Sequence, residues 1–505
     1  MPIGKLTIYG NVDLLLLSRI RMNTKLLKQK ILDLAIRGKL TQQLKSDGTA
    51  ADLLKEICDR TQEKTSLRAK RGNPSPQTII PLDKSEAPFE IPANWEWVRL
   101  GDVASLCLGK MLDKSKNKGT YCRYLRNVNI RWGEFDFSDI AEMKFEDVAD
   151  NRFLIKYGDL VMCEGGEPGR CAVWTDSDTI HFQKALHRIR FFNGFIPKFY
   201  QYLFFFYANK KILDNYFTGS TIKHLTGESL REIPIPLPPL AEQQRIVAKI
   251  EEAFAEIDSI ENNKELLKTH IKQTRQKILD LAIHGKLVPQ NKADEPASIL
   301  LERITRDNPH YEKMTDVPFE IPESWEWVKL GDVVKQVTDF VASGSFASLR
   351  ENVKYYKEEN YAILVRTLDF RNNFENDLTY TDKHGYEFLS NSNLFGGELL
   401  LSNIGSIGKV FIVPKLNKRM TLAPNSIMVR HYDDSQRDWL YYFFLSPVGQ
   451  EVLLSISSST TQAKFNKTQL KGVLVPLPPL AEQKRIVDRI EEIFASLDEI
   501  SLHLV

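Results

Sequence analysis

The stretch PLPPLAEQQRIV at residues 236–247 returns, with one change, as PLPPLAEQKRIV at residues 476–487. A second stretch, PFEIPANWEWV at 88–98, returns as PFEIPESWEWV at 318–328. Offsets of 240 and 230 residues are far above the roughly 20–50 residues of solenoid and propeller repeats. The chain therefore contains one large unit twice. We expect the stretches that repeat to carry the scaffold and those that differ to carry specificity.

The repeated stretch predicts the start of a long helix. Pro238 and Pro239 suit a helix entrance, and Glu242 in the first turn favours the positive end of the helix dipole. Apolar residues then follow at alternating steps of four and three as far as Leu281, and Gly285 ends the run. The pattern predicts one helix of roughly 44 residues, about 65 Å long at 1.5 Å per residue.

The second copy of this helix is divided between the two ends of the chain. Residues 480–500 repeat its first half, and residues 24–36 repeat its second half through the shared QKILDLAI. Such an apolar stripe needs a partner, and the simplest is the composite of the two terminal helices, antiparallel to the central helix. The alternative is that each helix packs only on its own domain. The predicted seam comprises Ile246, Ile250, Ile257, Ile260, Leu267, Ile271, Ile278, Leu281, Ile486, Ile490, Ile493, Leu497, Ile31 and Leu34.

Between the helices lie short β-branched and aromatic runs separated by Gly, Asn and Asp turns. Strands are expected at 124–130, 159–163, 171–174, 361–366, 398–402 and 409–413, and aromatic helices at 197–207 and 439–445. The predicted fold class is α+β, with two mixed α/β domains separated by long antiparallel coiled-coil helices in a pseudo-twofold, circular arrangement.

The repeats also predict domain boundaries. Residues 1–21 lie outside the repeat as an N-terminal extension, so Met22 is an alternative start. The remaining segments are the N-terminal half of the composite helical region plus a linker (22–87), domain 1 (88–237), the central helical spacer (238–317), domain 2 (318–477) and the C-terminal half of the helical region (478–505).

The composition excludes several classes of protein. All five cysteines fall in the first half without counterparts in the second, so a disulfide or zinc framework of the shared fold is not expected. No apolar run approaches the ~20 residues of a membrane span, and no secretory cleavage site is present, so we expect a cytoplasmic protein. The net charge of +2 leaves room for local basic surfaces.

No residues are predicted to be catalytic or to bind a metal. The glycine clusters at 165–169 and 405–408 lack phosphate-binding spacing and indicate tight turns. The sequence Glu482-Gln483-Lys484 resembles half of a nuclease signature, but its counterpart at 242–244 lacks the lysine, and both lie at a predicted helix start. The Asn-Pro-Pro-aromatic tetrapeptide of amino-methyltransferases is missing from the sequence.

Basic residues in the loops of both domains point to a polyanion. Lysine and arginine contact phosphates, and Arg, Asn and Gln can read base edges. Any one such residue is more often simply solvated, but two clusters on duplicated domains favour a long polyanion. The predicted DNA-binding residues are Lys110, Lys114, Lys116, Arg123, Arg126, Arg131, Lys223, His224, Arg366, Arg371, Lys409, Lys418, Arg419, Lys464 and Lys467.

The paired PLPPLAEQ tracts, each closing a domain and opening a helix, and the paired WEWV tracts resemble the specificity subunits of type I restriction-modification systems. The resemblance runs from Met22 to the C-terminus. It implies that each domain is a target-recognition domain for one half of a bipartite double-stranded DNA site, and that the helices set the gap.

It further implies docking of two methyltransferase subunits, with restriction/translocase subunits as additional partners. S-adenosylmethionine, ATP and Mg would bind those partners, so this chain is expected to hold no cofactor. Two alternatives remain open at this point. A duplicated protein-protein scaffold would have no salt-dependent affinity for DNA, and a fused methyltransferase would itself bind S-adenosylmethionine.

Overall fold

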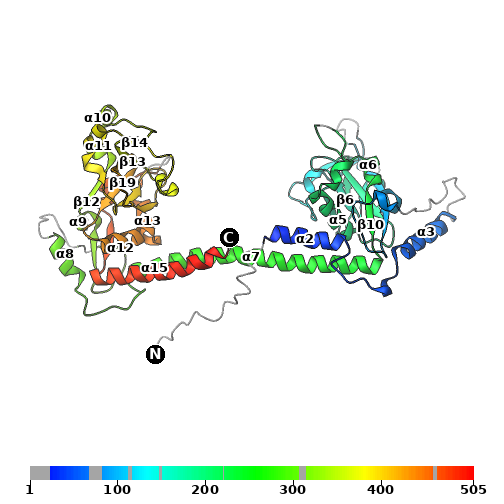
Figure 1. Ribbon diagram of the computed structural model, residues 1–505, viewed down its shortest axis with the longest axis horizontal. Helices are drawn as coiled ribbons and strands as arrows, with labels where there is room; N and C mark the ends of the chain where they lie inside the picture. The colour runs from blue at the N-terminus through cyan, green and yellow to red at the C-terminus, as the bar shows by residue number, and fades with distance from the viewer. Residues whose placement is uncertain are drawn as a thin grey trace. The chain divides into compact units, whose positions relative to one another are not determined.

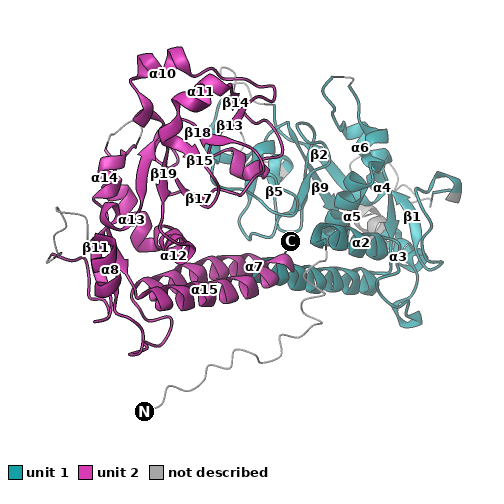
Figure 2. Ribbon diagram, turned by 60° about the vertical axis from the view of Figure 1, so that its left-hand side comes forward, with its two compact units in different colours: residues 1–263 teal, residues 264–505 magenta. Residues whose placement is uncertain are grey.

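The computed structural model describes residues 23–66, 82–111, 117–146, 151–219, 221–305, 314, 316–458 and 463–504. It divides into two compact units, Met1–Asn263 (unit 1) and Lys264–Val505 (unit 2), coloured separately in Figure 2. The division falls inside the long helix α7 (Leu240–Ile283), so each unit contains half of it. The predicted N-terminal extension and most of the predicted linker lie outside the described residues.

The described residues of unit 1 form three antiparallel or mixed sheets. Strand β1 (Glu96–Arg99) pairs with β10 (Pro234–Leu237). One four-stranded sheet has the order β2-β9-β6-β7, and the other, with the order β4-β3-β8-β5, includes the parallel pair β3 and β8. The remaining strands are β2 (Ala104–Leu108), β3 (Thr120–Leu125), β4 (Ala141–Phe145), β5 (Leu154–Ile155), β6 (Leu160–Cys163), β7 (Cys171–Val173), β8 (Ile180–Phe182) and β9 (Leu186–Phe191).

Helices pack against these sheets. The described helices of unit 1 besides α7 are α2 (Thr24–Ile36), α3 (Ala50–Ser66), α4 (Leu100–Val103), α5 (Pro197–Asn209) and α6 (Gly227–Glu232), with short 3-10 turns η1 (Lys45–Asp47), η3 (Lys84–Glu86), η4 (Asn127–Asn129), η5 (Asn151–Phe153) and η6 (Ile212–Tyr216).

Unit 2 repeats the same sheet orders. Strand β11 (Glu326–Lys329) pairs with β20 (Leu474–Leu477), and the four-stranded sheets have the orders β12-β19-β16-β17 and β14-β13-β18-β15. The remaining strands are β12 (Gln336–Asp339), β13 (Ala362–Val365), β14 (Tyr380–Thr381), β15 (Asn393–Leu394), β16 (Leu399–Ser402), β17 (Val410–Ile412), β18 (Met420–Leu422) and β19 (Ser426–Arg430).

The main difference lies between β12 and β13. There unit 2 carries η7 and α10 in residues 340–361, where unit 1 has the shorter stretch 109–119 between β2 and β3. The helical segments are α8 (Ala297–Thr305), α9 (Leu330–Val333), η7 (Phe340–Ser343), α10 (Phe346–Asn352), η8 (Asp369–Asn372), α11 (Lys383–Phe388), η9 (Ser390–Ser392), α12 (Asp434–Leu445), α13 (Pro447–Ser455), α14 (Lys467–Lys471) and α15 (Leu480–Leu502).

The proline-rich stretch at residues 234–239 forms an edge strand before the chain enters the helix. Pro234 and Pro236 lie in β10, opposite Arg99 and Trp97 of β1. Proline has no N–H to donate, so a strand that pairs on one side only can accept it. The two-stranded sheet therefore closes the domain without a continuous ladder, and Pro238 and Pro239 lead directly into α7.

The helices and the sheets share one core in each unit. In unit 1, Leu32 and Ile36 of α2 pack in the same buried cluster as Ile246 and Ile250 of α7 and the aromatic side chains of α5. In unit 2, Leu279 and Ile283 of α7 share a cluster with Ile486 and Ile490 of α15. Each paired helix is therefore also part of its domain.

The structure confirms the predicted helices at 24–36 and 240–283 and the α+β class with two repeated domains. The strand predicted at 124–130 is wrong beyond Leu125. There the Asn129 side chain accepts a hydrogen bond from the Arg126 N–H at 2.9 Å and holds a 3-10 turn instead, because local side-chain bonds compete with extended backbone. The aromatic helix α12 begins earlier than expected because Asp433 caps it.

None of the helices in the described part of the chain combines the length and apolar character that a membrane span requires.

Candidate nucleic-acid interface

Two helices lie side by side in unit 1, with α2 antiparallel to the first half of α7 (Figure 1). The Lys28 ammonium contacts the carboxylates of Asp258 and Glu261 on α7 and lies 5.7 Å from the Phe254 ring centroid. Burial acts against the charge of Lys28, but the hydrogen bond and the charge of Asp258 act more strongly together, so its pKa is raised.

Unit 2 makes the equivalent contacts between the second half of α7 and α15 (Figure 1). The Arg275 guanidinium is 2.5 Å from the Asp498 carboxylate and 4.5 Å from the Phe494 ring centroid. Arg275 takes the place of Lys28 in the repeat, and the acidic and aromatic partners also correspond. A basic side chain, an aspartate and a phenylalanine ring therefore meet between the paired helices in both units.

None of the fourteen seam positions is exposed. Ile246, Ile250, Ile486 and Ile490 have no exposed surface, and Ile257 and Ile271 are also buried, whereas the others are half-buried. Sequence reasoning missed a second buried face, which carries Leu32 and Leu279 and packs on the domain core. The signal for it was the identity of QKILDLAI in both copies, including positions off the seam.

A buried carboxylate marks the junction of helix and domain in unit 1. Glu242 of α7 accepts hydrogen bonds from Trp95 Nε1 at 2.9 Å and from the amide of Gln43. Burial raises the pKa of Glu242, although these hydrogen bonds act in the opposite direction. One side chain thus ties together the domain's first strand, the α2–α3 connection and the start of α7.

Unit 2 repeats this junction. Glu482 accepts from Trp325 Nε1 at 2.9 Å and from Gln290, and burial raises the pKa of Glu482 as well. The junctions also share a glycine: Gly38 and Gly285 have φ of +64° and +66°, and a Cβ on either would lie 2.4 Å from a proline Cγ. The junction comprises Gln43, Trp95, Gly38 and Glu242 in unit 1 and Gln290, Trp325, Gly285 and Glu482 in unit 2.

Several predicted DNA-binding residues are engaged within their own domain. Arg126 pairs with Asp139 at 2.7 Å, and its counterpart Arg366 pairs with the buried Asp369 at 2.6 Å. Arg126 follows β3 in unit 1, and Arg366 follows the equivalent strand β13 in unit 2. In each unit the ion pair stabilises the loop after this strand. The other paired cations are Lys110 with Glu146, Arg131 with Asp136, Lys223 with Asp214, Lys418 with Glu359 and Lys467 with Asp339.

A smaller group has no carboxylate partner among the described residues. Arg419 lies 4.5 Å from the Tyr361 ring centroid, and Lys409 Nζ is 3.4 Å from the Ser406 hydroxyl. Lys114 and Lys116 lie outside the described residues. The full group without a carboxylate partner is Arg123, His224, Arg371, Lys409, Arg419 and Lys464.

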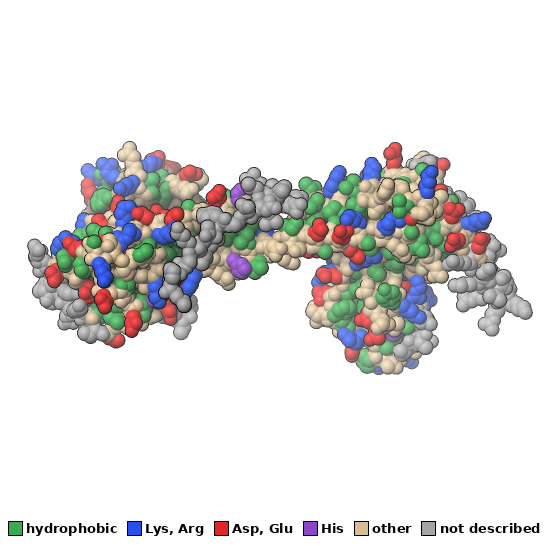
Figure 3. Space-filling model, turned by 90° about the horizontal axis from the view of Figure 1, so that it is seen from below, with side chains coloured by type: hydrophobic (Ala, Val, Ile, Leu, Met, Phe, Trp, Pro, Cys, Tyr) green, Lys and Arg blue, Asp and Glu red, His purple; other side chains and the backbone are tan. Residues whose placement is uncertain are grey.

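Charges of both signs are interspersed over the face of each unit seen in Figure 3. This agrees with the net charge of +2. The face seen in Figure 3 is therefore not a uniformly basic surface.

The family model for the type I restriction modification DNA specificity domain matches the chain twice, at residues 92–269 and 322–502. The chain belongs to this family. Each match starts just before the junction tryptophans and runs through one variable domain into its helix. Specificity subunits are the non-catalytic, DNA-recognition subunits of type I restriction-modification systems, and this chain is one of them.

Curated relatives match the specificity subunit over nearly its whole length. The EcoAI specificity subunit of Escherichia coli is 26% identical over 98% of this chain and 91% of its own length. The EcoEI specificity subunit of Escherichia coli is 24% identical over 99% of this chain and 92% of its own.

Solved structures show a similar fold. The HsdS subunit of Thermoanaerobacter tengcongensis is 21% identical, with 83% of this chain and 93% of that chain covered and a TM-score of 0.51. A chain from a study of complex assembly and conformational transition of the type I R-M system is 22% identical, with 82% and 93% covered and a TM-score of 0.50.

Proposed function

We propose that each unit of this specificity subunit reads one half of a bipartite DNA target. The recognition domains would be residues 88–237 and 318–477, as the repeats delimit them. The observation that carries this proposal is the repetition of the junction and of the helix-pair contacts, while the loops between them differ. A shared scaffold with different loops is what two different half-sites require.

The helices α2, α7 and α15 would set the gap between the half-sites and dock two methyltransferase subunits. Restriction/translocase subunits would complete the complex, with S-adenosylmethionine, ATP and Mg bound by those partners. We place the complex in the cytoplasm, where its DNA is. The protein-protein scaffold is not favoured, because the family is defined by DNA specificity.

The loop cations without carboxylate partners are proposed as the main phosphate contacts. Those already in surface ion pairs remain weaker candidates. A surface pair contributes only about 0–1 kcal/mol, so DNA can still compete for its cation. This ranks Lys464 and Arg371 above Arg366, whose partner Asp369 is fully buried.

Salt-titrated DNA binding by the full chain tests this function. The logarithm of affinity should fall linearly with the logarithm of salt, with a slope of about −0.9 per neutralised phosphate. Lys464→Gln and Arg371→Gln should each reduce the slope by about one. Lys249→Gln, which removes an exposed lysine paired with Glu252 on α7, is the matched control. A chain whose DNA affinity does not depend on salt would be a protein scaffold instead.

A further inference from the structure

Each unit has an equivalent surface position that is held together by the same backbone hydrogen bonds. In unit 1, the loop after β6 meets the segment before α6 through the Leu225 N–H, which donates to the Glu164 carbonyl at 2.8 Å. In unit 2, Phe465 N–H donates to the Asn403 carbonyl at 3.1 Å in the same way. These pairs make the loop residues Glu164 and Asn403 structurally equivalent.

A third loop is hydrogen-bonded to Glu164 in unit 1 and to Asn403 in unit 2. The Glu164 N–H donates to Ala185 O at 3.0 Å, and the Asn403 N–H donates to Asn425 O at 3.3 Å. His224 lies beside this loop in unit 1, because a Cβ on Gly165 would be 3.1 Å from its Nδ1. The equivalent residue of unit 2 is Lys464, which bridges to Ile404. We name this the three-loop position.

The side chains at the three-loop position differ completely. Unit 1 presents a carboxylate, a methyl group and an imidazole, whereas unit 2 presents two amides and an ammonium. The backbone hydrogen bonds at this position are the same in both units, so these substitutions alter its chemistry without altering the local fold. A duplicated reader of two different sequences needs such a position.

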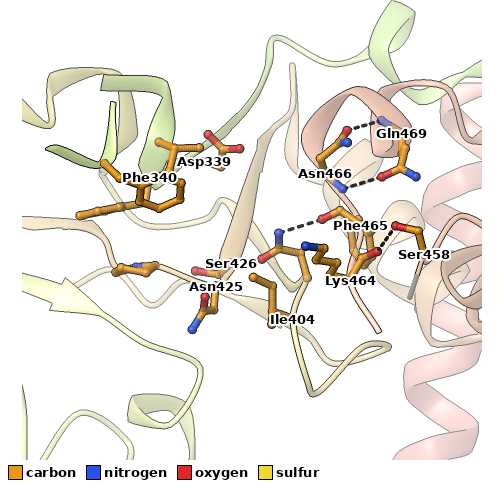
Figure 4. A pocket seen from close by; sticks show the side chains of 14 residues that line it. Asp339, Phe340, Ile404, Asn425, Ser426, Ser458, Lys464, Phe465, Asn466 and Gln469 are labelled. Atoms are coloured by element: carbon orange, nitrogen blue, oxygen red, sulfur yellow. Dashed lines mark hydrogen bonds between the residues drawn. The ribbon is translucent and has the colours of Figure 1, made fainter. Parts of the chain in front are cut away.

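In unit 2 the position is hollowed, with a volume of about 350 Å³. One wall comes from the segment between β12 and β13 that is longer than in unit 1. It contributes Phe340, Val341 and Phe346, the last 77% exposed. Figure 4 shows Asp339 and Phe340 on one side of the hollow, with Phe465 and Gln469 on the other.

Two amides of the hollow have unused hydrogen-bonding capacity. The Asn425 side chain is exposed and has no partner in the part of the chain that the structure describes. Asn403 donates its amide N–H to Phe465 O at 2.9 Å, while its Oδ1 is buried and unpaired. By contrast, Gln469 is committed, since it accepts from the Asn466 N–H and donates to Ile456 O.

We propose that the hollow of unit 2 reads the major-groove edge of an adenine, with Asn425 donating to N7 and accepting from N6. Asparagine makes this bidentate contact with adenine in many DNA complexes. Lys464 holds an adjacent phosphate, and Phe346 provides apolar contact for a thymine methyl group. This inference rests on the proposed function and assigns one base within it.

The test compares the full chain and its variants, with cognate methyltransferase subunits, in selection from a random duplex library. Asn425 has φ of +72°, a conformation that glycine adopts without strain. Asn425→Gly therefore removes the amide and leaves the backbone. We expect the adenine preference at one position to fall roughly 5- to 150-fold, with the other half-site unchanged.

A second variant makes the result independent of stability. Asn425→Asp keeps the size and accepts hydrogen bonds without donating, so the preference at that position should move from adenine to cytosine, whose N4 amino group donates. Asn373→Gly is the matched control, because Asn373 is also exposed and left-handed, with φ of +48°, but does not line the hollow.

Two outcomes would overturn the inference: variants that keep the full preference at every position, or variants that weaken binding to all sequences equally. If the wild-type complex selects no sequence at all, the proposed function itself fails. That result is distinct from a selective wild type whose Asn425 variants are unchanged.

Discussion

The residues of the junction are the same in both units, whereas the side chains of the three-loop position differ between them. At the junction, the carboxylate, the tryptophan and the glycine of unit 1 all recur in unit 2 with the same contacts. At the three-loop position the backbone contacts recur, but Glu164 becomes Asn403 and Ala185 becomes Asn425. Contacts that are kept in both copies therefore maintain the geometry of the domain. Side chains that differ between the copies can determine which DNA sequence each unit recognises.

The comparison also separates two kinds of basic residue. Arg126 and Arg366 are kept in both copies and pair with acidic residues of their own loops. Lys464 has no carboxylate partner in the described ranges, and its equivalent in unit 1 is His224. Arg371 also has no such partner there, whereas its equivalent in unit 1, Arg131, pairs with Asp136 at 3.0 Å. Cations that keep their ion pair in both units resemble the junction, and those that differ in type or in pairing resemble the three-loop position.

The largest effect is expected from Gly38→Ala and Gly285→Ala. Each places a Cβ 2.4 Å from a proline Cγ, at a positive φ that alanine disfavours. We expect each to destabilise its own unit by about 3 kcal/mol, measured by urea unfolding and assigned to a unit by hydrogen exchange. A change confined to one of the two would break the equivalence of the junctions.

Next come Glu242→Ala and Glu482→Ala. Each leaves a buried tryptophan Nε1–H without its acceptor, which costs about 2 kcal/mol. The two losses should agree with each other in thermal or urea unfolding. Glu256→Ala, on an exposed position of α7, serves as the control and should change stability by less than about 0.5 kcal/mol.

The pH dependence of folding stability also tests the equivalence of the two junctions. Burial raises the pKa of both junction glutamates in the folded state. A raised pKa adds stability at pH values below the ordinary range of glutamate, and this stability is lost as pH rises through the folded pKa. The doubly substituted Glu242→Gln/Glu482→Gln chain should therefore lose less stability between pH 4 and pH 8 than the wild type. Identical pH profiles would show that neither carboxylate is perturbed.

The smallest effect is expected at the helix-pair contacts. Asp258→Asn and Asp498→Asn each remove one partially exposed ion pair, so each should cost about 0.5 kcal/mol and less at high salt. Denaturation at two ionic strengths measures this. A loss above about 2 kcal/mol would mean that these pairs, and not the buried seam, hold the helices together.

The helical framework could be predicted from the sequence because its signals are local. Proline at the entrance, apolar steps of four and three, and a final glycine set the bounds of α7 within the chain itself. The role of Glu242 could not be predicted. In the sequence it is a favourable first-turn charge, whereas its partner Trp95 is 147 residues away.

The proposed DNA-contacting residues were less predictable for the same reason. Arg366 and Lys464 look alike in the sequence as basic loop residues. Only the fold shows that Arg366 is held by the buried Asp369. The hollow combines residues from four separate segments, so no spacing pattern could have pointed to Asn425.

The most direct test of two independent readers on one scaffold is a chain in which residues 88–237 are replaced by residues 318–477. Its DNA target would be determined by mapping the adenines that its complex methylates. The account predicts an inverted repeat, in which both halves match the half-site of unit 2 and the gap is unchanged. A target that keeps the original asymmetric sequence, or a folded complex that recognises no sequence, would contradict it.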